Sequence, residues 1–203
     1  SAKHWSRIIL YLSAMSLAFV MKLNHVVVVL RGSSNMKIIV AADNNWAIGN
    51  NGQLLITIPS DLKSFQQETL GKTIVYGRKT LQTFPRQMVL SDRENIILSR
   101  NEDYQEKGAE VVHSIDELMK KLSKHNSDEV FVVGGSSIYE QLLPYCNICY
   151  VTKLDREFEA DSFFPNLDED PEWELYDESD EMVYFDTPYT YMTYIRKGTK
   201  IQS

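Results

Sequence analysis

The residues best suited to chemistry in this sequence lie directly after short apolar runs. Gly134 and Gly135 follow the run Glu-Val-Phe-Val-Val at 129–133 and precede a helix-forming segment. Glycine allows a ligand to approach the backbone closely, and the first N–H groups of a helix are unpaired and partly positive. This arrangement is typical of a phosphate site, although two glycines also suit a tight turn between a strand and a helix.

A second glycine turn carries positive charge. Gly77-Arg78-Lys79-Thr80 follows the apolar run 73–76, and Arg100 follows the run 95–99. Cations beside a nucleotide phosphate site would bind an additional phosphate, such as the 2′-phosphate of NADP. The alternative is that these are exposed, solubilising side chains. The nearby Gly-Lys-Thr at 71–73 is not a P-loop, because position 66, where the first glycine is needed, holds Gln66.

The third candidate is a single acid in apolar surroundings. Asp61 follows Pro59 at the expected start of a helix, and its apolar neighbours are Leu54, Leu55, Ile56, Ile58, Leu62 and Phe65. A carboxylate in such a pocket can bind a cationic or amidine-like heterocycle through paired hydrogen bonds, and with a raised pKa it can assist protonation. The alternative interpretation is an acid that only stabilises the helix dipole.

Metal and thiol chemistry are not indicated. Cys146 and Cys149 form a CxxC at the start of an expected strand, whereas a redox CxxC begins a helix. The histidines are scattered without ligand spacing, so no metal site is expected. Two cysteines also exclude a disulfide scaffold and fit a reducing compartment, which predicts a cytoplasmic protein.

The elements that must position these residues alternate along the chain. Strands are predicted over 37–42, 73–76, 95–99, 109–113, 129–133 and 147–154, helices over 59–70, 78–83, 114–122 and 136–143, and a C-terminal antiparallel hairpin over 173–177 and 189–196. Residues 44–55 are expected to form a polar loop, with Leu62, Phe65 and Leu70 at core spacing in the helix that follows. Ser114 and Glu117 are expected to form a capping box. The pattern predicts an α/β, three-layer fold, with an eight-stranded, mostly parallel central sheet, an antiparallel C-terminal hairpin strand, and helices on both faces.

The chain divides into a leader and one domain. Residues 1–35 contain an uncharged apolar stretch over 8–21, which is shorter than the ~20 residues of a membrane span. They are interpreted as a leader outside the fold, either non-native, translated from an upstream start, or a targeting segment, and residues 36–203 as the folded domain.

The domain is expected to be monomeric and to bind no membrane. The net charge of −7 argues against nucleic-acid binding, and 14 acids with one arginine between 155 and 186 are interpreted as a solvated surface.

The motifs taken together resemble dihydrofolate reductase. The matching stretches are AADNNWAIGNNGQL, IPSDLKSF, VYGRKTL, NIILSR, VVGGSSIYEQLLP and YVTKLDREFEADSFFP, in this order from about Met36 to Arg196. The resemblance implies reduction of 7,8-dihydrofolate to tetrahydrofolate, with hydride from NADPH and protonation at N5 of the pterin. It also implies that antifolate inhibitors bind.

The resemblance also implies roles for individual residues. Asp61 would be the catalytic acid that binds the pterin, Thr152 would support it, and Arg93 would bind the α-carboxylate of folate. The remaining substrate-binding residues would be Ile39, Ala41, Leu62, Phe65 and Val133. The cofactor-binding residues would be Ala41, Ile48, Gly77, Arg78, Lys79, Thr80, Leu98, Ser99, Arg100, Val133, Gly134, Gly135, Ser136, Ser137, Ile138 and Tyr139. The segment 44–55 would be the mobile active-site loop.

The sequence departs from the family pattern at Ile56, where a tryptophan is often found, and at Ser136, which replaces the third glycine of a Gly-Gly-Gly. Ser137 stands where some members have an arginine. Two other functions remain possible from the sequence. One is the NADPH-dependent pyrimidine reductase of riboflavin synthesis, which shares the cofactor half. The other is a nucleotide-binding module without catalysis, which would not need Asp61.

Overall fold

The computed structural model describes residues 20–23, 26–29 and 34–200 of the chain. The chain forms two compact units, residues 1–34 and 35–203. In the first unit, β1 (Val20–Leu23) and β2 (Val26–Val29) pair as an antiparallel hairpin. The predicted leader ended at residue 35, but Asn35 belongs to the second unit, where its N–H donates to Ser127 Oγ and its Oδ1 accepts from Asn147 Nδ2. Apart from these two strands, Ser34 and Asn35, the predicted leader lies outside the described residues. Within the described part of the chain, no helix is long and apolar enough to cross a membrane.

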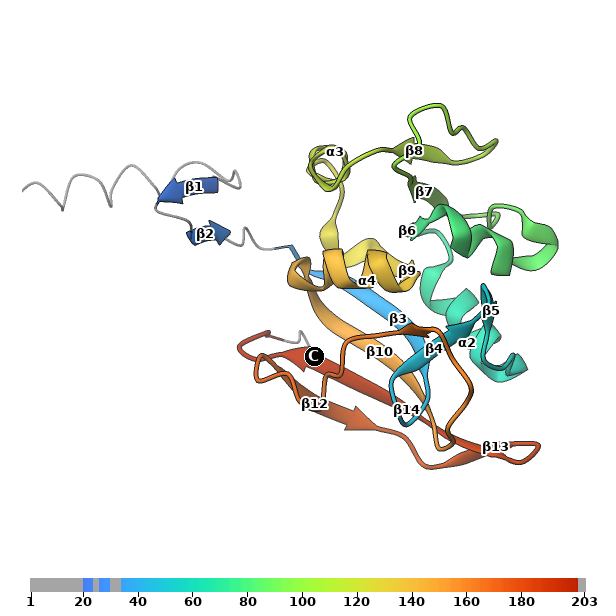
Figure 1. Cartoon of the computed structure of the whole chain (residues 1–203). Coiled ribbons are helices and arrows are strands. Elements are labelled where there is room, and N and C mark those ends of the chain that lie inside the picture. The colour runs from blue at the N-terminus through green and yellow to red at the C-terminus, as the bar shows by residue number, and fades with distance from the viewer. Residues whose placement is uncertain (1–19, 24–25, 30–33, 201–203) are drawn as a thin grey trace, which may run out of the picture. The chain divides into compact units, whose positions relative to one another are not determined.

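A large mixed sheet organises the second unit (Figure 1). Its strands, in spatial order, are β12 (Trp173–Glu178), β14 (Thr187–Arg196), β10 (Cys146–Leu154), β3 (Met36–Ala42), β9 (Val130–Gly134), β6 (Thr73–Gly77), β7 (Glu94–Leu98) and β8 (Glu110–Val112), and β13 (Met182–Tyr184) pairs with β14. The pairs from β10 to β8 are parallel, and all pairs of β14 are antiparallel. The predicted fold class, with its mostly parallel sheet and antiparallel C-terminal hairpin, is confirmed.

Helices cover the two faces of this sheet. Alternate residues of β3, including Ile38 and Val40, pack with α3 (Ile115–Leu122) and α4 (Ser136–Leu142) on one face. Ile39 points to the other face and packs in a second cluster with Phe65 of α2 (Pro59–Thr69). The alternation follows from the period of two in a strand, and it means that β3 is buried from both sides.

Short 3-10 helices complete the connections. They are η1 (Arg78–Thr83), η2 (Pro85–Gln87), η3 (Ser127–Glu129) and η4 (Leu143–Tyr145). The short helix predicted over 78–83 is therefore present, and it is a 3-10 helix. Pro144 lies within η4, just after the end of α4, as expected for a residue that cannot continue a helix.

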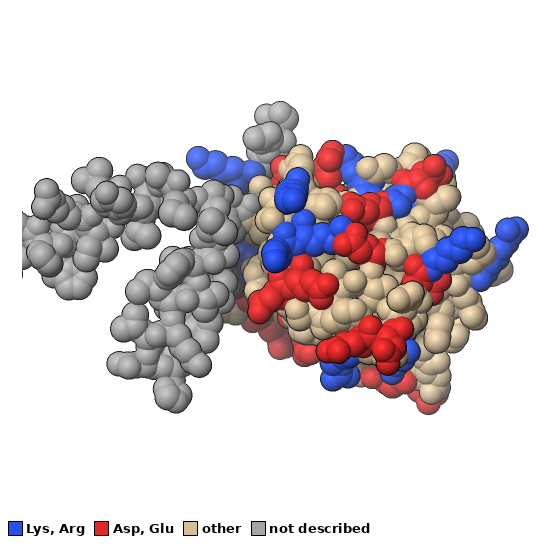
Figure 2. All heavy atoms as spheres, turned by 90° about the horizontal axis from the view of Figure 1, so that it is seen from above, with Lys and Arg blue, Asp and Glu red and all other residues tan. Residues whose placement is uncertain are grey.

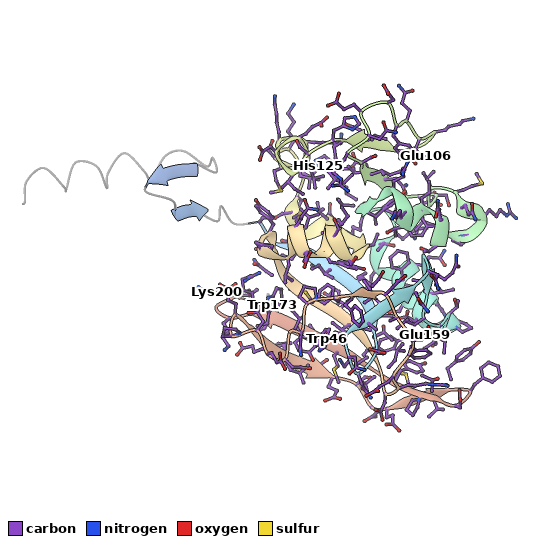
Figure 3. The ribbon with its side chains drawn as sticks, in the orientation of Figure 1. Trp46, Glu106, His125, Glu159, Trp173 and Lys200 are labelled. Atoms are coloured by element: carbon purple, nitrogen blue, oxygen red, sulfur yellow. The ribbon has the colours of Figure 1, made fainter. Side chains whose placement is uncertain are left out.

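The expected polar loop at 44–55 is in fact partly sheet. β4 (Ala47–Asn50) and β5 (Gln53–Leu54) form a hairpin, and β11 (Ser162–Phe163) adds to β4. The sequence did not predict this small sheet, because its strands are only two to four residues long and lie between strong turn signals. Trp46, labelled in Figure 3, anchors its base, with its ring centroid 5.9 Å from that of Phe164 and 5.7 Å from that of Tyr194.

Two further local predictions need correction. Leu62 and Leu70 were expected in the core, but 45% and 50% of their surfaces are exposed, and Thr69 is the buried residue of α2. At the start of α3, the Glu117 N–H donates to Ser114 Oγ, but the Glu117 carboxylate accepts from the N–H of His113, one residue before the cap. The bond from the Glu117 N–H is the one expected for a capping box. The carboxylate, however, bonds the N–H of His113 where a capping box would use the N–H of Ser114.

The charged surface is mixed. Figure 2 shows Lys and Arg side chains lying among Asp and Glu side chains on the face that it presents. Mixed signs of this kind are typical of a solvated protein surface.

The core predicts one stability effect. Leu118 of α3 is fully buried against the sheet. We expect Leu118→Ala to lower the free energy of unfolding by about 2–5 kcal/mol, because the substitution leaves a cavity. Urea denaturation followed by circular dichroism measures this, with the exposed Lys124→Ala as control, expected within about 0.5 kcal/mol of wild type. An equal effect of the two substitutions would contradict this packing.

Candidate active site

A cleft of about 1670 Å³ opens at the carboxyl ends of the parallel strands. β3 and β9 pair only at Lys37–Phe131 and Ile38–Val132, after which their ladder stops. The hydroxyl of Tyr139, on α4, donates to the carbonyl oxygen of Ile39 at 2.7 Å and satisfies the first carbonyl beyond the ladder. Ligands of open α/β sheets bind where neighbouring strands separate in this way.

All but one of the residues that the sequence assigned to a site line this cleft. The lining includes Asp61, Ile39, Ala41, Leu62, Phe65, Arg93 and Val133 toward one end, and Ile48, Gly77, Arg78, Lys79, Thr80, Leu98, Ser99, Arg100, Gly134, Gly135, Ser136, Ser137, Ile138 and Tyr139 toward the other. Thr152 is the exception, because it lies behind Asp61. One continuous cleft thus has room for two ligands side by side.

Asp61 is held at the first turn of α2. Ile58, the residue before the helix, is buried against Leu154 and Tyr189, and Pro59 starts the helix with its fixed φ. Thr152 Oγ1 on β10 donates to Asp61 Oδ1 at 2.5 Å. Burial raises the pKa of Asp61, and the hydrogen bond from Thr152 opposes this only in part. The carboxyl group therefore remains protonated to a higher pH than that of an exposed aspartate.

Arg93 lies near the C-terminal end of the same helix. Its Nη1 donates to the buried Thr69 Oγ1 at 3.1 Å, and its Nε donates to the carbonyl oxygen of Ser91 at 2.9 Å. Both contacts orient the guanidinium toward the cleft, where it can pair with a carboxylate. Arg93 and Asp61 thus stand at the two ends of α2.

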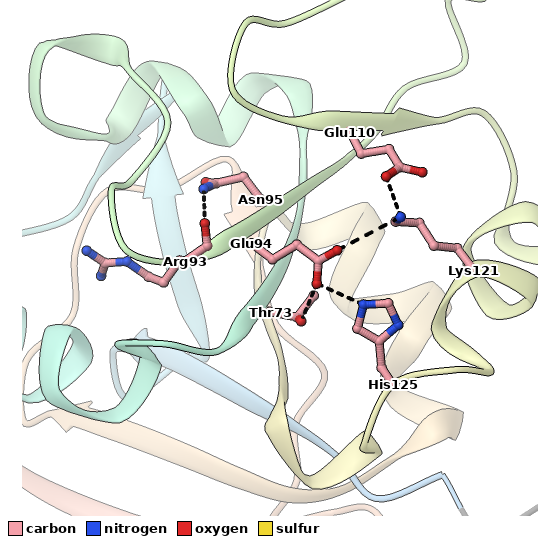
Figure 4. Close-up of polar contacts among 7 residues, drawn as sticks. All are labelled: Thr73, Arg93, Glu94, Asn95, Glu110, Lys121 and His125. Carbon is pink, nitrogen blue, oxygen red and sulfur yellow. Dashed lines mark hydrogen bonds and ion pairs between the residues drawn. The ribbon is translucent and has the colours of Figure 1, made fainter.

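A polar cluster fixes the start of β7, the strand that Arg93 directly precedes. Its neighbour Glu94 points the opposite way and accepts hydrogen bonds from Thr73 Oγ1 at 2.7 Å and from His125 Nε2 at 2.8 Å (Figure 4). Burial raises the pKa of Glu94, but these hydrogen bonds and the charges of His125 and Lys121 outweigh it and lower the pKa overall. The sequence analysis did not identify this cluster, because its members come from four elements.

The glycine turns allow close packing of the backbone at the other end of the cleft. A Cβ on Gly134 would lie 3.3 Å from Thr80 Oγ1, and one on Gly77 would lie 3.0 Å from Ile138 Cγ1. Gly134 also has φ of +129°, which other residues rarely adopt. The first N–H groups of α4 lack carbonyl partners within the helix, so this surface can receive phosphate oxygens.

Three cations surround that surface. Arg78, Lys79 and Arg100 are exposed and line the cleft. The guanidinium carbon of Arg78 lies 5.5 Å from the ring centroid of Tyr104, and Tyr104 Oη donates to Glu106 at 2.8 Å. Burial, followed by the hydrogen bond to Glu106, raises the pKa of Tyr104 to about 12. Tyr104 therefore stays neutral and supports Arg78 by a cation–π contact, a role that sequence analysis missed.

The CxxC has no place in the cleft. Cys146 and Cys149 are free, buried thiols, and burial raises the pKa of both. Within residues 20–23, 26–29 and 34–200, no group of three or more His, Cys, Asp or Glu side chains could hold a metal ion. Buried thiols of this kind are unreactive.

Comparisons with known proteins agree with the geometry. The protein-family model described as dihydrofolate reductase matches residues 35–196. The dihydrofolate reductase of Staphylococcus haemolyticus is 42% identical over 130 residues, covering 64% of this chain and 76% of that protein, and that of Bacillus subtilis is 35% identical over 153 residues, covering 75% and 88%. A solved structure of dihydrofolate reductase from Enterococcus faecalis complexed with NADP(H) and RAB-propyl superposes with a TM-score of 0.72 at 33% identity, covering 81% of this chain and 98% of that chain.

The raised pKa of Asp61 predicts a stability effect. A carboxyl group whose pKa is higher in the folded state destabilises the fold once pH rises above its unfolded value, and the loss is complete above the folded pKa. We expect Asp61→Asn to raise the free energy of unfolding of the ligand-free protein at pH 7 by about 0.5–2 kcal/mol. The gain should vanish as pH falls below the ordinary aspartate pKa.

Urea denaturation of wild type and Asp61→Asn between pH 4 and pH 8 measures this. The exposed Asp103→Asn is the matched control and should show no such gain. A destabilised Asp61→Asn protein at pH 7 would show that the carboxylate is favourable where it lies.

Proposed function

The chain belongs to the dihydrofolate reductase family, and we propose that it reduces 7,8-dihydrofolate to 5,6,7,8-tetrahydrofolate with NADPH. The observation that carries the proposal is one cleft with a buried carboxyl group at one end and a glycine-lined, cationic surface at the other. A nucleotide-binding module without catalysis would not require the costly burial of Asp61.

Asp61 is proposed to bind the pterin. Its carboxylate can accept two parallel hydrogen bonds from the 2-amino group and a ring nitrogen, an amidine-like pair that matches carboxylate geometry. Thr152 holds Oδ1 from behind and so fixes the plane of the carboxyl group. The raised pKa lets the same group assist protonation at N5.

The rest of the cleft orients the substrate. Ile39, Leu62, Phe65 and Val133 provide apolar walls for the pterin and benzoyl rings, and Ala41 leaves room between them. Arg93 is proposed to pair with the α-carboxylate of the substrate's glutamate. Helical spacing predicted Leu62 in the core, but the residue is exposed and lines the cleft, as this wall requires. Orientation of this kind supplies much of the rate in a reaction between two bound molecules.

The glycine turns and cations fit NADPH. Gly77, Gly134 and Gly135 line the cleft, where a Cβ would approach Ile138 or Thr80, and Ser136, Ser137 and Ile138 begin α4 beside them. Arg78, Lys79 and Arg100 would bind the 2′-phosphate, Thr80 and Ser99 the neighbouring oxygens, and Ile48, Leu98 and Tyr139 would pack along the cofactor. When bound, NADPH supplies the hydride.

The setting is also part of the proposal. Residues 36–203 are proposed to form the catalytic domain, acting as a monomer in the cytoplasm without nucleic acid or membrane. The free cysteines fit a reducing compartment. Antifolates that present a diaminopyrimidine would pair with Asp61 as the pterin does.

Turnover tests the proposal directly. We expect the 203-residue chain to oxidise NADPH only when dihydrofolate is added, and Asp61→Asn to lower kcat by about 100-fold or more. The absorbance of NADPH measures the rate, and fluorescence titration should show unchanged NADPH affinity in the variant. Wild-type protein that binds NADPH without turnover would favour the pyrimidine reductase or the binding module.

Cofactor choice gives a separate test. We expect Arg78→Gln to weaken NADPH binding by about 10-fold or more, because a charge-assisted hydrogen bond to phosphate is lost. Binding of NADH, which lacks the 2′-phosphate, should change little. Fluorescence titrations with both cofactors measure this, and equal losses for the two would contradict the assignment of Arg78.

A further inference from the structure

A second, small cavity lies behind Asp61. Its volume is about 90 Å³, and it is separate from the substrate cleft. Only Ile39, Asp61 and Phe65 line both, so Asp61 is the single titratable residue shared by the two spaces. We call the small space the rear cavity.

The fold places polar groups around the rear cavity from three elements. Residues 61, 64, 65 and 68 share one face of α2, because they are three or four positions apart. Thr152 and Tyr191 are directly opposite each other on β10 and β14, as are Tyr150 and Thr193. The hydroxyl and carboxyl groups of the lining belong to Asp61, Ser64, Glu68, Tyr150, Thr152, Tyr191 and Thr193.

These groups can hold water in contact with bulk solvent. A cavity of this size has room for a few water molecules, and its lining offers each of them several hydrogen-bond partners. Glu68, in the lining, is exposed, so the cavity reaches the molecular surface there. The other titratable groups on the cavity are Tyr150 and Tyr191, and burial raises the pKa of both, so they remain neutral donors and acceptors. The charge of Asp61 in turn acts on Tyr139 of α4, whose pKa is raised mainly by burial.

We propose that the rear cavity is the route by which protons from bulk water reach Asp61 while ligands fill the cleft. This inference rests on the proposed function. A ligand that pairs with Asp61 covers the carboxyl group from the cleft, whereas Thr152 contacts it from the rear. The shared lining residues besides Asp61 are the apolar Ile39 and Phe65, so Asp61 is the polar residue that borders both spaces.

The proton transfer balances through Thr152. Reduction adds one hydride and one proton to the substrate, which leaves Asp61 ionised when the proton comes from its carboxyl group. Thr152 Oγ1 already donates its hydrogen to Asp61 Oδ1. It passes that proton to Oδ1 and accepts one from a water in the rear cavity, and bulk water returns a proton to that water. Thr152 is thus a relay residue and does not touch the substrate.

Ser64 provides the test because it lines the rear cavity and not the cleft. Ser64→Leu fills the space, while the matched Ser64→Ala removes the hydroxyl and leaves the space open. With saturating NADPH and dihydrofolate, we expect Ser64→Leu to lower kcat by about tenfold and to increase the solvent isotope effect, with KM unchanged. Ser64→Ala should behave as wild type. Equal rates and isotope effects in the two variants would overturn the proposal.

A second readout does not depend on turnover. A bound diaminopyrimidine shares a proton with Asp61, and NMR measures the exchange of that proton with water in the full-length chain. We expect exchange to be slower in Ser64→Leu than in Ser64→Ala, and equal exchange would contradict a rear route. If wild type exchanges this proton but does not reduce dihydrofolate, the proposed function fails while the route through the cavity remains.

A milder pair of variants covers the case in which leucine at position 64 prevents folding, as judged by circular dichroism. Tyr191→Phe removes the hydroxyl of the residue directly opposite the relay residue Thr152, whereas Tyr189→Phe removes one that bonds Ser60 Oγ at 2.7 Å outside both spaces. The proton exchange should slow only in Tyr191→Phe. Identical exchange in the two tyrosine variants would count against the proposal.

Discussion

The separation of β3 from β9 is the constraint on which the rest of the site depends. Two parallel strands that stay paired to their ends leave no space between them, but this pair stops at Ile38–Val132. Beyond that point β3 continues with β10, and β9 continues with β6. The sheet thereby opens at its carboxyl edge while remaining continuous below. Tyr139 keeps the opening from exposing an unpaired carbonyl, since its hydroxyl serves Ile39.

A buried carboxyl group is the cost of using this opening. Asp61 loses hydration, and the structure gives it one hydrogen bond from Thr152 in partial compensation. Natural proteins keep an incompletely compensated buried charge of this kind mainly where it serves binding or catalysis. The surrounding structure restrains α2 from elsewhere, through Ile58 packed on Leu154 and Tyr189 and through the C-terminal contact between Thr69 and Arg93. The helix can therefore hold an unfavourable group in a fixed place.

Much of this was predictable from the sequence because local signals and the fold agree. Buried parallel strands gave apolar runs such as 129–133, and Gly71, with φ of +73°, ends α2 where expected. Leu62 and Leu70 were misplaced because helical spacing identifies an apolar face without saying whether it meets a core or a cleft. Strands β4 and β5 were missed because pairing with β11, more than 100 residues away, stabilises segments too short to carry a periodic signal.

What the sequence could not supply are the contacts that orient the charged groups. Arg78 and Arg93 were identified as cations near ligands, but their supports are Tyr104 and Thr69, each remote in sequence and ordinary in type. The neighbour of Arg93, Glu94, is fixed on the other side of β7 by Thr73 and His125. Because Arg93 directly precedes β7, anchoring Glu94 at the start of that strand also restrains the backbone from which the Arg93 side chain extends. A flexible arginine would lose side-chain entropy on binding a carboxylate, and one already held by two hydrogen bonds loses less. The networks outside the cleft thus act on ligand affinity without touching a ligand.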